Sequence, residues 1–235
     1  MSDFEVAIRN SFTSHFPDVT PKGCLFHFSK AILSKVSKSG FKSDYSNKSS
    51  PQFGSFVRAI LGLGYVPLYR FKEGLRNLYV LAKRLSGRQR KFSRRMIEYV
   101  EKVWVNGNFP PETWVMFQHD GETTNNHSEA YNYRLGSKKR ISKHPNAYLF
   151  VSVVIDELKS SMRDTVMAKQ GNINKKKSTN SRRAKILEMK KTLMSGLEEN
   201  TVELISYQKA MGSSVVSNFT AAREVDSSSE PIMIL

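Results

Sequence analysis

The sequence predicts a mainly α-helical chain with at most a short pair of strands near residues 22–28. Apolar residues recur at helical spacing in one segment after another, and Pro or Gly ends most of these segments. The chain has 235 residues, of which 39% are hydrophobic, which is enough for one sizeable core followed by a tail. Two complete domains would be too many for this length.

The N-terminal half is expected to contain most of the core. A first amphipathic helix is predicted over 4–16, where Pro17 stops the apolar pattern. The turn at Pro21-Lys22-Gly23 leads into the apolar stretch 24–28, which is typical of a short buried strand. Helices are then predicted at 29–36, 53–63, 71–85 and 92–104, with a polar loop at 41–51.

The C-terminal half is expected to be less compact. A helix at 126–135 would carry Glu129, and a mostly apolar, buried helix is predicted from 145 to about 158, although the β-branched run 151–155 also suits a strand. Residues 161–183 are predicted to be a basic linker, 184–211 a C-terminal helix, and 212–235 a disordered, Ser-rich tail.

The charge indicates a polyanionic partner. There are 37 Lys and Arg residues against 21 Asp and Glu residues, a formal charge of +16, and nearly all of the excess lies in segments 81–102 and 158–192. Such clusters bind phosphates in a salt-dependent and largely sequence-independent manner. Nucleic acid is favoured over an anionic membrane surface, and DNA contacts are predicted for Lys83, Arg84, Arg88, Arg90, Lys91, Arg94 and Arg95.

Simpler interpretations of the same clusters stay open. A run of Lys and Arg is also typical of a solvated helix face or a nuclear-import signal, and the run 175–183 favours an import signal or a flexible arm. The aromatic residues Phe92 and Tyr99 interleave with the first cluster, but their helical spacing favours a place in the core over base stacking.

Several classes of protein are excluded by composition. No apolar run approaches the roughly 20 residues that span a bilayer, and the N-terminus MSDFEVAIRN lacks the features of a signal peptide. A soluble, intracellular protein is therefore expected, and an import signal at 175–183 would place it in the nucleus. The single cysteine excludes an intramolecular disulfide and leaves too few thiols for a Cys-rich zinc module.

Two acidic residues, Asp3 and Glu129, are candidates for a catalytic metal site. Two-metal phosphoryl transfer needs carboxylates that hold a pair of Mg²⁺ or Mn²⁺ ions. Taken singly, Asp3 is typical of a helix N-cap and Glu129 of an exposed helical residue. The surrounding motifs change this interpretation: Ser2-Asp3-Phe4-Glu5-x-Ala7, Gly23-Cys24-x-Phe26-His27-Phe28, Tyr99-x-x-x-x-Trp104 and Thr124-Asn125-Asn126-x-x-Glu129.

In this order, these motifs closely resemble the transposase domain of Mutator-like elements (MULE). The resemblance covers roughly residues 2–160 and implies a DDE catalytic core of RNase H-like fold, DNA as the substrate, and an all-helical insertion at about 29–115. Asp3 would be the second catalytic Asp and Glu129 the catalytic Glu, together holding Mg²⁺ or Mn²⁺ in a complete family site.

The resemblance also assigns supporting residues. Cys24 and His27 match the Cys-x-x-His pair that follows the second Asp, and are expected to order the flank of the active site more than to bind a metal. Asn125 and Asn126 are expected to cap the helix that carries Glu129, because Asn side chains accept hydrogen bonds from free backbone amides.

The departures from the family limit the expected activity. Residues 130–132 replace the usual Gly-aromatic-His, and the family's first Asp, which bridges the two metals, has no counterpart upstream of Asp3. We therefore expect an incomplete RNase H-like core with one or two short strands, DNA binding without cleavage, and no tightly bound metal. The alternatives are the C-terminal part of a complete DDE transposase, or a helical interaction module that forms homo-oligomers through 184–211.

Overall fold

The structure is a computed structural model that describes residues 4–19, 21–46, 51–117, 131, 133, 146–171 and 177–226. Contacts between Cα atoms divide the chain into two compact units. The first unit comprises Met1–Thr124 and Ile186–Leu235, and the second comprises Asn125–Lys185. Each unit is described by itself.

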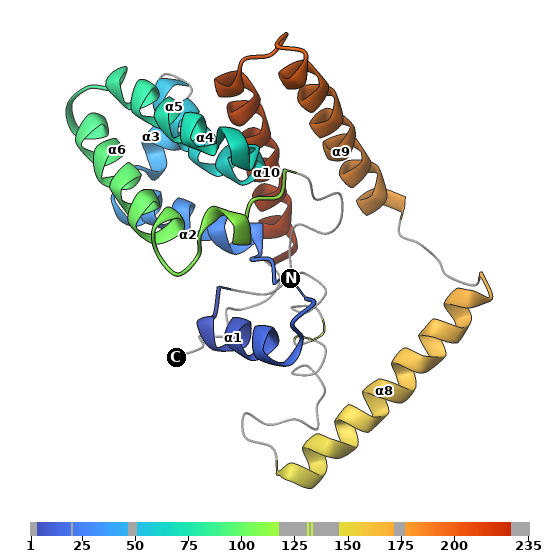
Figure 1. Ribbon diagram of the computed structural model, residues 1–235. Coiled ribbons are helices and arrows are strands. Elements are labelled where there is room, and N and C mark those ends of the chain that lie inside the picture. Colours follow the sequence, from blue (N-terminus) through green and yellow to red (C-terminus); the bar gives the residue numbers. More distant parts are fainter. Residues whose placement is uncertain are drawn as a thin grey trace. The chain divides into compact units, whose positions relative to one another are not determined.

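The first unit is built from helices (Figure 1). Its α-helices are α1 (Val6–His15), α2 (Leu25–Lys38), α3 (Lys42–Ser46), α4 (Pro51–Gly62), α5 (Phe71–Lys83), α6 (Gly87–Tyr99), the later part of α9 (Lys177–Glu198) and α10 (Leu204–Asp226). Short 3₁₀ turns lie at Leu63–Tyr65, Leu68–Arg70 and Pro111–Thr113, and a π-helical turn at Val100–Val105 extends α6.

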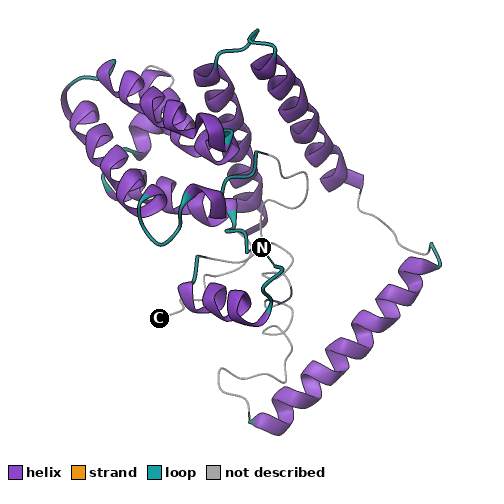
Figure 2. Ribbon diagram, viewed as in Figure 1, coloured by secondary structure: helices purple, strands orange, loops and turns teal. Residues whose placement is uncertain are grey.

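The described residues contain no β-strand, as Figure 2 shows, and only an isolated bridge at Gly23. The prediction of a mainly helical chain is therefore confirmed, and helices joined by turns and short loops make up the described part of the region 29–115. An RNase H-like core stays a prediction.

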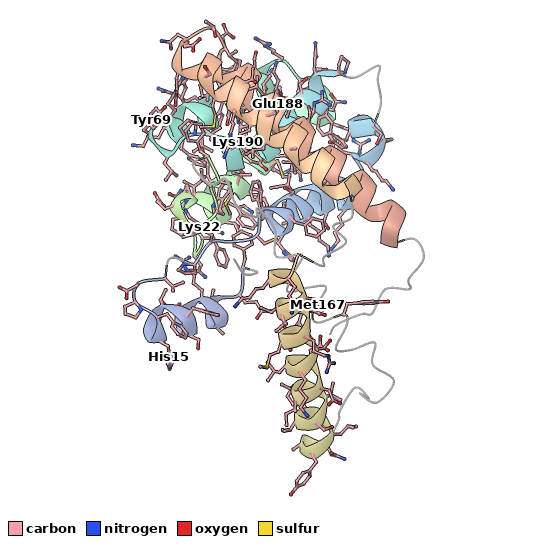
Figure 3. All side chains as sticks on the ribbon, turned by 90° about the vertical axis from the view of Figure 1, so that its right-hand side faces the viewer. His15, Lys22, Tyr69, Met167, Glu188 and Lys190 are labelled. Atoms are coloured by element: carbon pink, nitrogen blue, oxygen red, sulfur yellow. The ribbon has the colours of Figure 1, made fainter. Side chains whose placement is uncertain are left out.

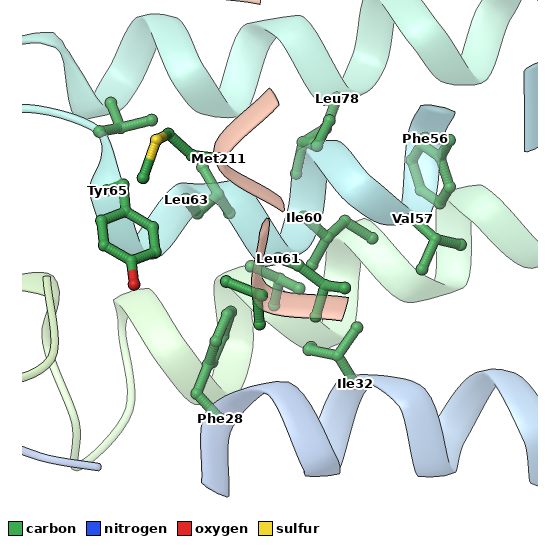
Figure 4. Close-up of a cluster of buried hydrophobic side chains, with 14 of the residues drawn as sticks. Phe28, Ile32, Phe56, Val57, Ile60, Leu61, Leu63, Tyr65, Leu78 and Met211 are labelled. Carbon is green, nitrogen blue, oxygen red and sulfur yellow. The ribbon is translucent and has the colours of Figure 1, made fainter. Parts of the chain in front are cut away.

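Helix α4 is the centre of the core. Eight of its twelve residues are buried, which is typical of a helix that other elements largely enclose. It packs against α10 on one side and α5 on another, and α5 packs in turn against α6. Figure 4 shows side chains of α2, α4, α5 and α10 meeting in one cluster. Its fully buried members from α4 are Phe53, Phe56, Val57, Ala59, Ile60 and Leu61.

Helices α4 and α10 approach each other unusually closely, because each has a glycine at the contact. A Cβ added to Gly62 would collide with the backbone carbonyl oxygen of Gln208. A Cβ added to Gly212 would collide in the same way with the carbonyl oxygen of Arg58. Only glycine lets each helix backbone lie directly against the other at these two points.

Two polar side chains of α10 are buried at the same contact and are fully hydrogen-bonded. The Tyr207 hydroxyl donates to the carbonyl of Tyr65 at 2.8 Å, and burial raises the pKa of Tyr207 well above its usual value. The Gln208 Nε2 donates to the carbonyls of Ala59 at 2.7 Å and Gly74 at 3.3 Å. Helix α10 is thereby tied to both α4 and α5.

The predicted strand at 24–28 is wrong, because these residues form the first turn of α2. The apolar residues of the supposed strand and of the following helix belong to one helical stripe: Leu25, Phe28, Ile32 and Val36 are all buried. The prediction places a boundary at Ser29, and this boundary interrupts the helical spacing of three and four. Ser29 itself is buried, and its hydroxyl donates to the carbonyl of Leu25 at 2.8 Å.

The predicted single helix at 184–211 is also wrong, because α9 ends at Glu198 and α10 begins at Leu204. Asn200 adopts a left-handed conformation with φ of 57°, which terminates a helix and which Asn tolerates better than most residues. The amides of Thr201 and Val202 then donate to the carbonyl of Gly196 at 2.8 and 2.9 Å. These hydrogen bonds give a carbonyl in the last turn of α9 its partners, and the chain turns there before α10.

The disorder expected from 212 onward is wrong for residues 212–226, which continue α10. Small residues are also typical of a flexible tail, but Gly212 is small because α10 lies against the backbone of Arg58 on α4 at this point. Ser214 is buried, and its hydroxyl donates to the carbonyl of Met211 at 2.7 Å. Residues 227–235 lie outside the described residues.

The second unit contains the 23-residue helix α8 (Ala147–Lys169). Asn146 caps it, accepting a hydrogen bond from the amide of Leu149 at 2.8 Å, so the predicted helix is confirmed over the predicted strand. Its expected burial is wrong, since Tyr148, Val151, Ile155 and Leu158 are exposed. The predicted basic linker 161–183 is largely helical, in α8 and α9, where it is described.

None of the helices within the described ranges is long and apolar enough to cross a membrane.

The α4–α10 contact makes a first prediction. Gly62→Ala and Gly212→Ala should each lower the free energy of unfolding by about 1–3 kcal/mol, because overpacking forces the two backbones apart. Replacing Gly by Ala in a helix normally stabilises by up to about 1 kcal/mol, so the expected sign is reversed. Chemical denaturation of the purified variants measures the change.

Gly54→Ala is the matched control on α4. The nearest atoms to a Cβ at Gly54 belong to the end of the flexible Arg58 side chain, which can move away. This variant should be as stable as the wild type or more so. Equal destabilisation at Gly54, Gly62 and Gly212 would contradict the close-contact explanation.

Candidate nucleic-acid interface

The basic cluster predicted from the sequence lies mainly on α6. The helix begins at Gly87, whose φ of 50° follows an extended Ser86. Phe92, Met96 and Ile97 recur at steps of four and one, and all three are buried. With this spacing, one face of α6 packs against the core and the other face is exposed to solvent.

The solvent face of α6 is occupied almost entirely by cations. Five Lys and Arg residues of α6 are exposed. At 100° per residue, they lie around the part of the helix circumference that the buried residues do not occupy. Lys83 and Arg84, at the end of α5, are exposed as well. We call the following residues the basic face: Arg88, Arg90, Lys91, Arg94 and Arg95.

The basic face has little neutralisation from the rest of the described chain. None of its five cations forms an ion pair with a described residue, although Arg88 lies over the ring of Phe41, 5.2 Å from its centroid. Glu98 is the acidic residue on the same side of α6. The field that faces solvent is therefore positive overall, and such a field attracts polyanions.

A second carboxylate near the basic face, that of Glu101, is hydrogen-bonded to Tyr79. The Tyr79 hydroxyl on α5 donates to the two carboxylate oxygens of Glu101 at 2.9 and 3.0 Å. Desolvation raises the pKa of Tyr79, and the hydrogen bond to Glu101 raises it further. This bond also joins α5 to the π-helical turn that follows α6.

The aromatic residues of the segment support the helix from behind. Phe92 is 3% exposed and stacks on Phe41 with ring centroids 4.5 Å apart. Tyr99 is half-buried, and the Nζ of Lys35 lies 4.1 Å from its ring centroid. The prediction that these two rings belong to the core side is confirmed, so neither is presented for base stacking among the cations.

A polar bond further fixes the orientation of α6. The Gln89 Nε2 donates to the Asp44 carboxylate on α3 at 2.7 Å. Together with the buried Phe92, this bond holds the first two turns of the helix, where the cations are densest. The basic face is thus displayed on a rigid support.

Sequence reasoning missed further cations on α5. Lys72, Arg76 and Lys83 are exposed at steps of four and seven along this helix. The sequence predicts a DNA contact only for Lys83, because Lys72 and Arg76 lie outside the dense run of charge. The helical spacing of the three cations is the pattern that would have placed them on one exposed side of α5.

The carboxylates and amides assigned by the transposase resemblance cannot be placed in the same way. Asp3, Glu129, Asn125 and Asn126 lie outside the described residues. The helix entered after Asp3 begins at Val6 with Glu5 as its N-cap. The convergence of Asp3 and Glu129 on a metal pair stays a prediction.

Cys24 and His27 lie one helical turn apart at the start of α2. Cys24 is the N-cap and is fully buried, and its carbonyl accepts the amides of His27 at 3.1 Å and Phe28 at 3.3 Å. Among the residues described, no three His, Cys, Asp or Glu side chains are grouped to hold a metal ion. The backbone at this point binds a distant segment, because the amide of Gly23 donates to the carbonyl of Thr113 at 2.7 Å.

An aromatic cluster lies beside this junction. Phe4 meets Trp104 and Phe109 edge to face, with ring centroids 4.7 and 5.0 Å apart. Phe28 stacks on Trp114 at 4.4 Å, and the indole Nε1 of Trp114 donates to the carbonyls of Trp104 and Phe109, both at 3.0 Å. The segment 4–28, which contains motifs of the transposase resemblance, therefore packs against residues 104–114 at the end of the predicted helical insertion.

Comparison of the chain with protein-family models, with curated proteins and with solved structures gives no match. The transposase resemblance rests on the motifs in the sequence.

Proposed function

We propose that this chain derives from a transposase and binds DNA, and that the basic face of α6 binds the phosphate backbone of DNA. The observation that carries the proposal is the exposure of all five cations of that face without an ion pair to a described residue. Lys83 and Arg84 extend the same interface from the end of α5.

The dimensions of the basic face suit a duplex. Residues 88–95 rise about 10 Å along the helix axis at 1.5 Å per residue. Duplex DNA presents about six phosphate charges over that length. Five cations facing about six phosphates are well matched in density.

The chemistry of the face favours contacts with phosphates over contacts with bases. Four of its five cations are arginines, whose planar guanidinium binds phosphate oxygens in pairs. Phe92, the aromatic ring within this run, is buried. Binding through phosphates carries no sequence information by itself, so the proposed interaction is largely nonspecific.

The transposase origin is supported by the order of the motifs around Asp3, Cys24 and Glu129, and by the helical region between them. A nuclear location follows from the same proposal. Mg²⁺ or Mn²⁺ would belong to the complete family site and not to the basic face.

The second prediction tests DNA binding directly. Replacing Arg90, Arg94 and Arg95 together by Gln should weaken binding to a short duplex by on the order of 100-fold at 0.1 M salt, because three phosphate contacts are lost. The slope of log affinity against log salt should become shallower by about 2–3. Fluorescence anisotropy over a salt series measures both quantities.

A matched control removes the same charge elsewhere. Lys159, Arg163 and Lys169 are exposed on α8 and can be replaced together by Gln. This variant should retain most of the affinity and the wild-type slope. Wild-type binding that ignores salt, or equal losses in the two triple variants, would refute a localised phosphate interface.

The third prediction concerns cleavage. The resemblance assigns two acidic residues to this chain, Asp3 and Glu129, and two carboxylates without a bridging third make a poor two-metal site. Supercoiled plasmid incubated with the chain and Mg²⁺ or Mn²⁺ should therefore stay intact, with the wild type and Glu129→Gln indistinguishable. Nicking by the wild type that Glu129→Gln abolishes would show instead that the chain is catalytic.

A further inference from the structure

Helix α8 carries a continuous apolar stripe that is exposed along its whole length. Six large apolar residues follow one another at steps of three, four, three, four and four. The side chains of α8 are drawn as sticks in Figure 3. The stripe, which we call the α8 seam, consists of Tyr148 (91% exposed), Val151 (53%), Ile155 (45%), Leu158 (57%), Met162 (70%) and Val166 (53%).

The α8 seam is distinct from the buried side of the helix. Val153 and Glu157 are the buried residues of α8, and at 100° per residue they lie about 180° and 140° around the helix from Met162, in the middle of the seam. The seam is therefore a second face of the helix. A step pattern of alternating three and four is that of a coiled-coil interface, in which residues of one helix insert between those of another.

The net charge of α8 argues against a membrane surface as the occupant of the seam. Helices that lie on anionic bilayers carry an excess of Lys and Arg on the polar face. On α8, the three cations Lys159, Arg163 and Lys169 are balanced by three acids, Asp156, Glu157 and Asp164. A helix with no net charge is instead suited to pairing with an identical helix, which it does not repel.

The area of the seam is large enough for a dimer. Six large side chains that are about half exposed or more present several hundred Å², which approaches the roughly 800 Å² per partner of a standard interface. Exposed apolar patches of this size mark interaction sites on soluble proteins. Ile155 and Leu158 occupy adjacent core positions in the arrangement that favours two-stranded coils.

We propose that the α8 seam binds the α8 seam of a second copy of this chain, forming a two-stranded helical pair. The pairing would be isologous, with the same surface contributed by both copies. The seam spans only about three heptads, so the dimer is expected to be reversible on dilution. This inference does not rest on the proposed DNA binding.

Sedimentation of the full chain over a wide range of protein concentration tests the proposal. The wild type should approach twice the mass of one 26.8 kDa chain at high concentration and fall toward the single mass on dilution. Leu158→Glu places a carboxylate in the centre of the seam and should raise the dissociation constant at least 10-fold. The thermal midpoint at concentrations where the wild type is monomeric should not change.

Met167→Glu is the matched control. Met167, labelled in Figure 3, is a large apolar residue of the same helix with a similar exposed fraction of 47%. At 100° per residue it lies about 100° around the helix from Val166 and so off the seam. The self-association of this variant should equal that of the wild type. A difference in dissociation constant between the two Glu variants would show that the seam itself pairs, and that α8 does not associate nonspecifically through any apolar residue.

The following results would overturn the proposal. The wild type could be monomeric at every concentration, or Leu158→Glu and Met167→Glu could weaken the dimer equally. A monomeric wild type whose thermal midpoint falls in Leu158→Glu would show that the chain itself covers the seam. Binding of the monomer to vesicles containing phosphatidylserine, lost in Leu158→Glu, would identify a membrane as the occupant instead.

Discussion

The close contact between α4 and α10 is the constraint on which the rest of the first unit depends. Gly62 and Gly212 remove the side chains that would hold the two backbones apart, and Tyr207 and Gln208 use the resulting proximity to reach carbonyls of the core. A segment near the C-terminal end of the described chain thereby completes a core made mostly of residues 25–117. Without α10, buried apolar residues of α4 would lie partly in water.

This core also determines how the charge is displayed. Helix α4 supports α5, α5 supports α6, and the buried Phe92, Met96 and Ile97 orient α6 so that its five cations point outward. The Gln89–Asp44 and Tyr79–Glu101 bonds hold the neighbouring polar groups in place. A basic face on a rigid helix keeps its spacing as it meets a polyanion, so little ordering entropy is lost on binding.

The two units use their apolar residues differently. In the first unit, helical stripes from α2, α4, α5, α6 and α10 meet in a shared core. In the second, α8 has a stripe of similar composition that is exposed. Periodicity predicts that a face will be buried, but it does not say by what. The burial expected for residues 148–158 was therefore wrong even though the helix was predicted correctly.

By itself, the sequence determined the helical class, most helix positions and the location of the basic face, because the spacing of apolar and charged residues is a local property. The tertiary structure decided the rest. It made 24–28 the start of a helix, ended α9 at Glu198, and buried Gly212, Ser214 and Val215 in a Ser-rich segment. Small residues look alike in a flexible tail and in a close helix contact. Only the backbone of Arg58, more than 150 residues earlier in the chain, distinguishes the two at Gly212.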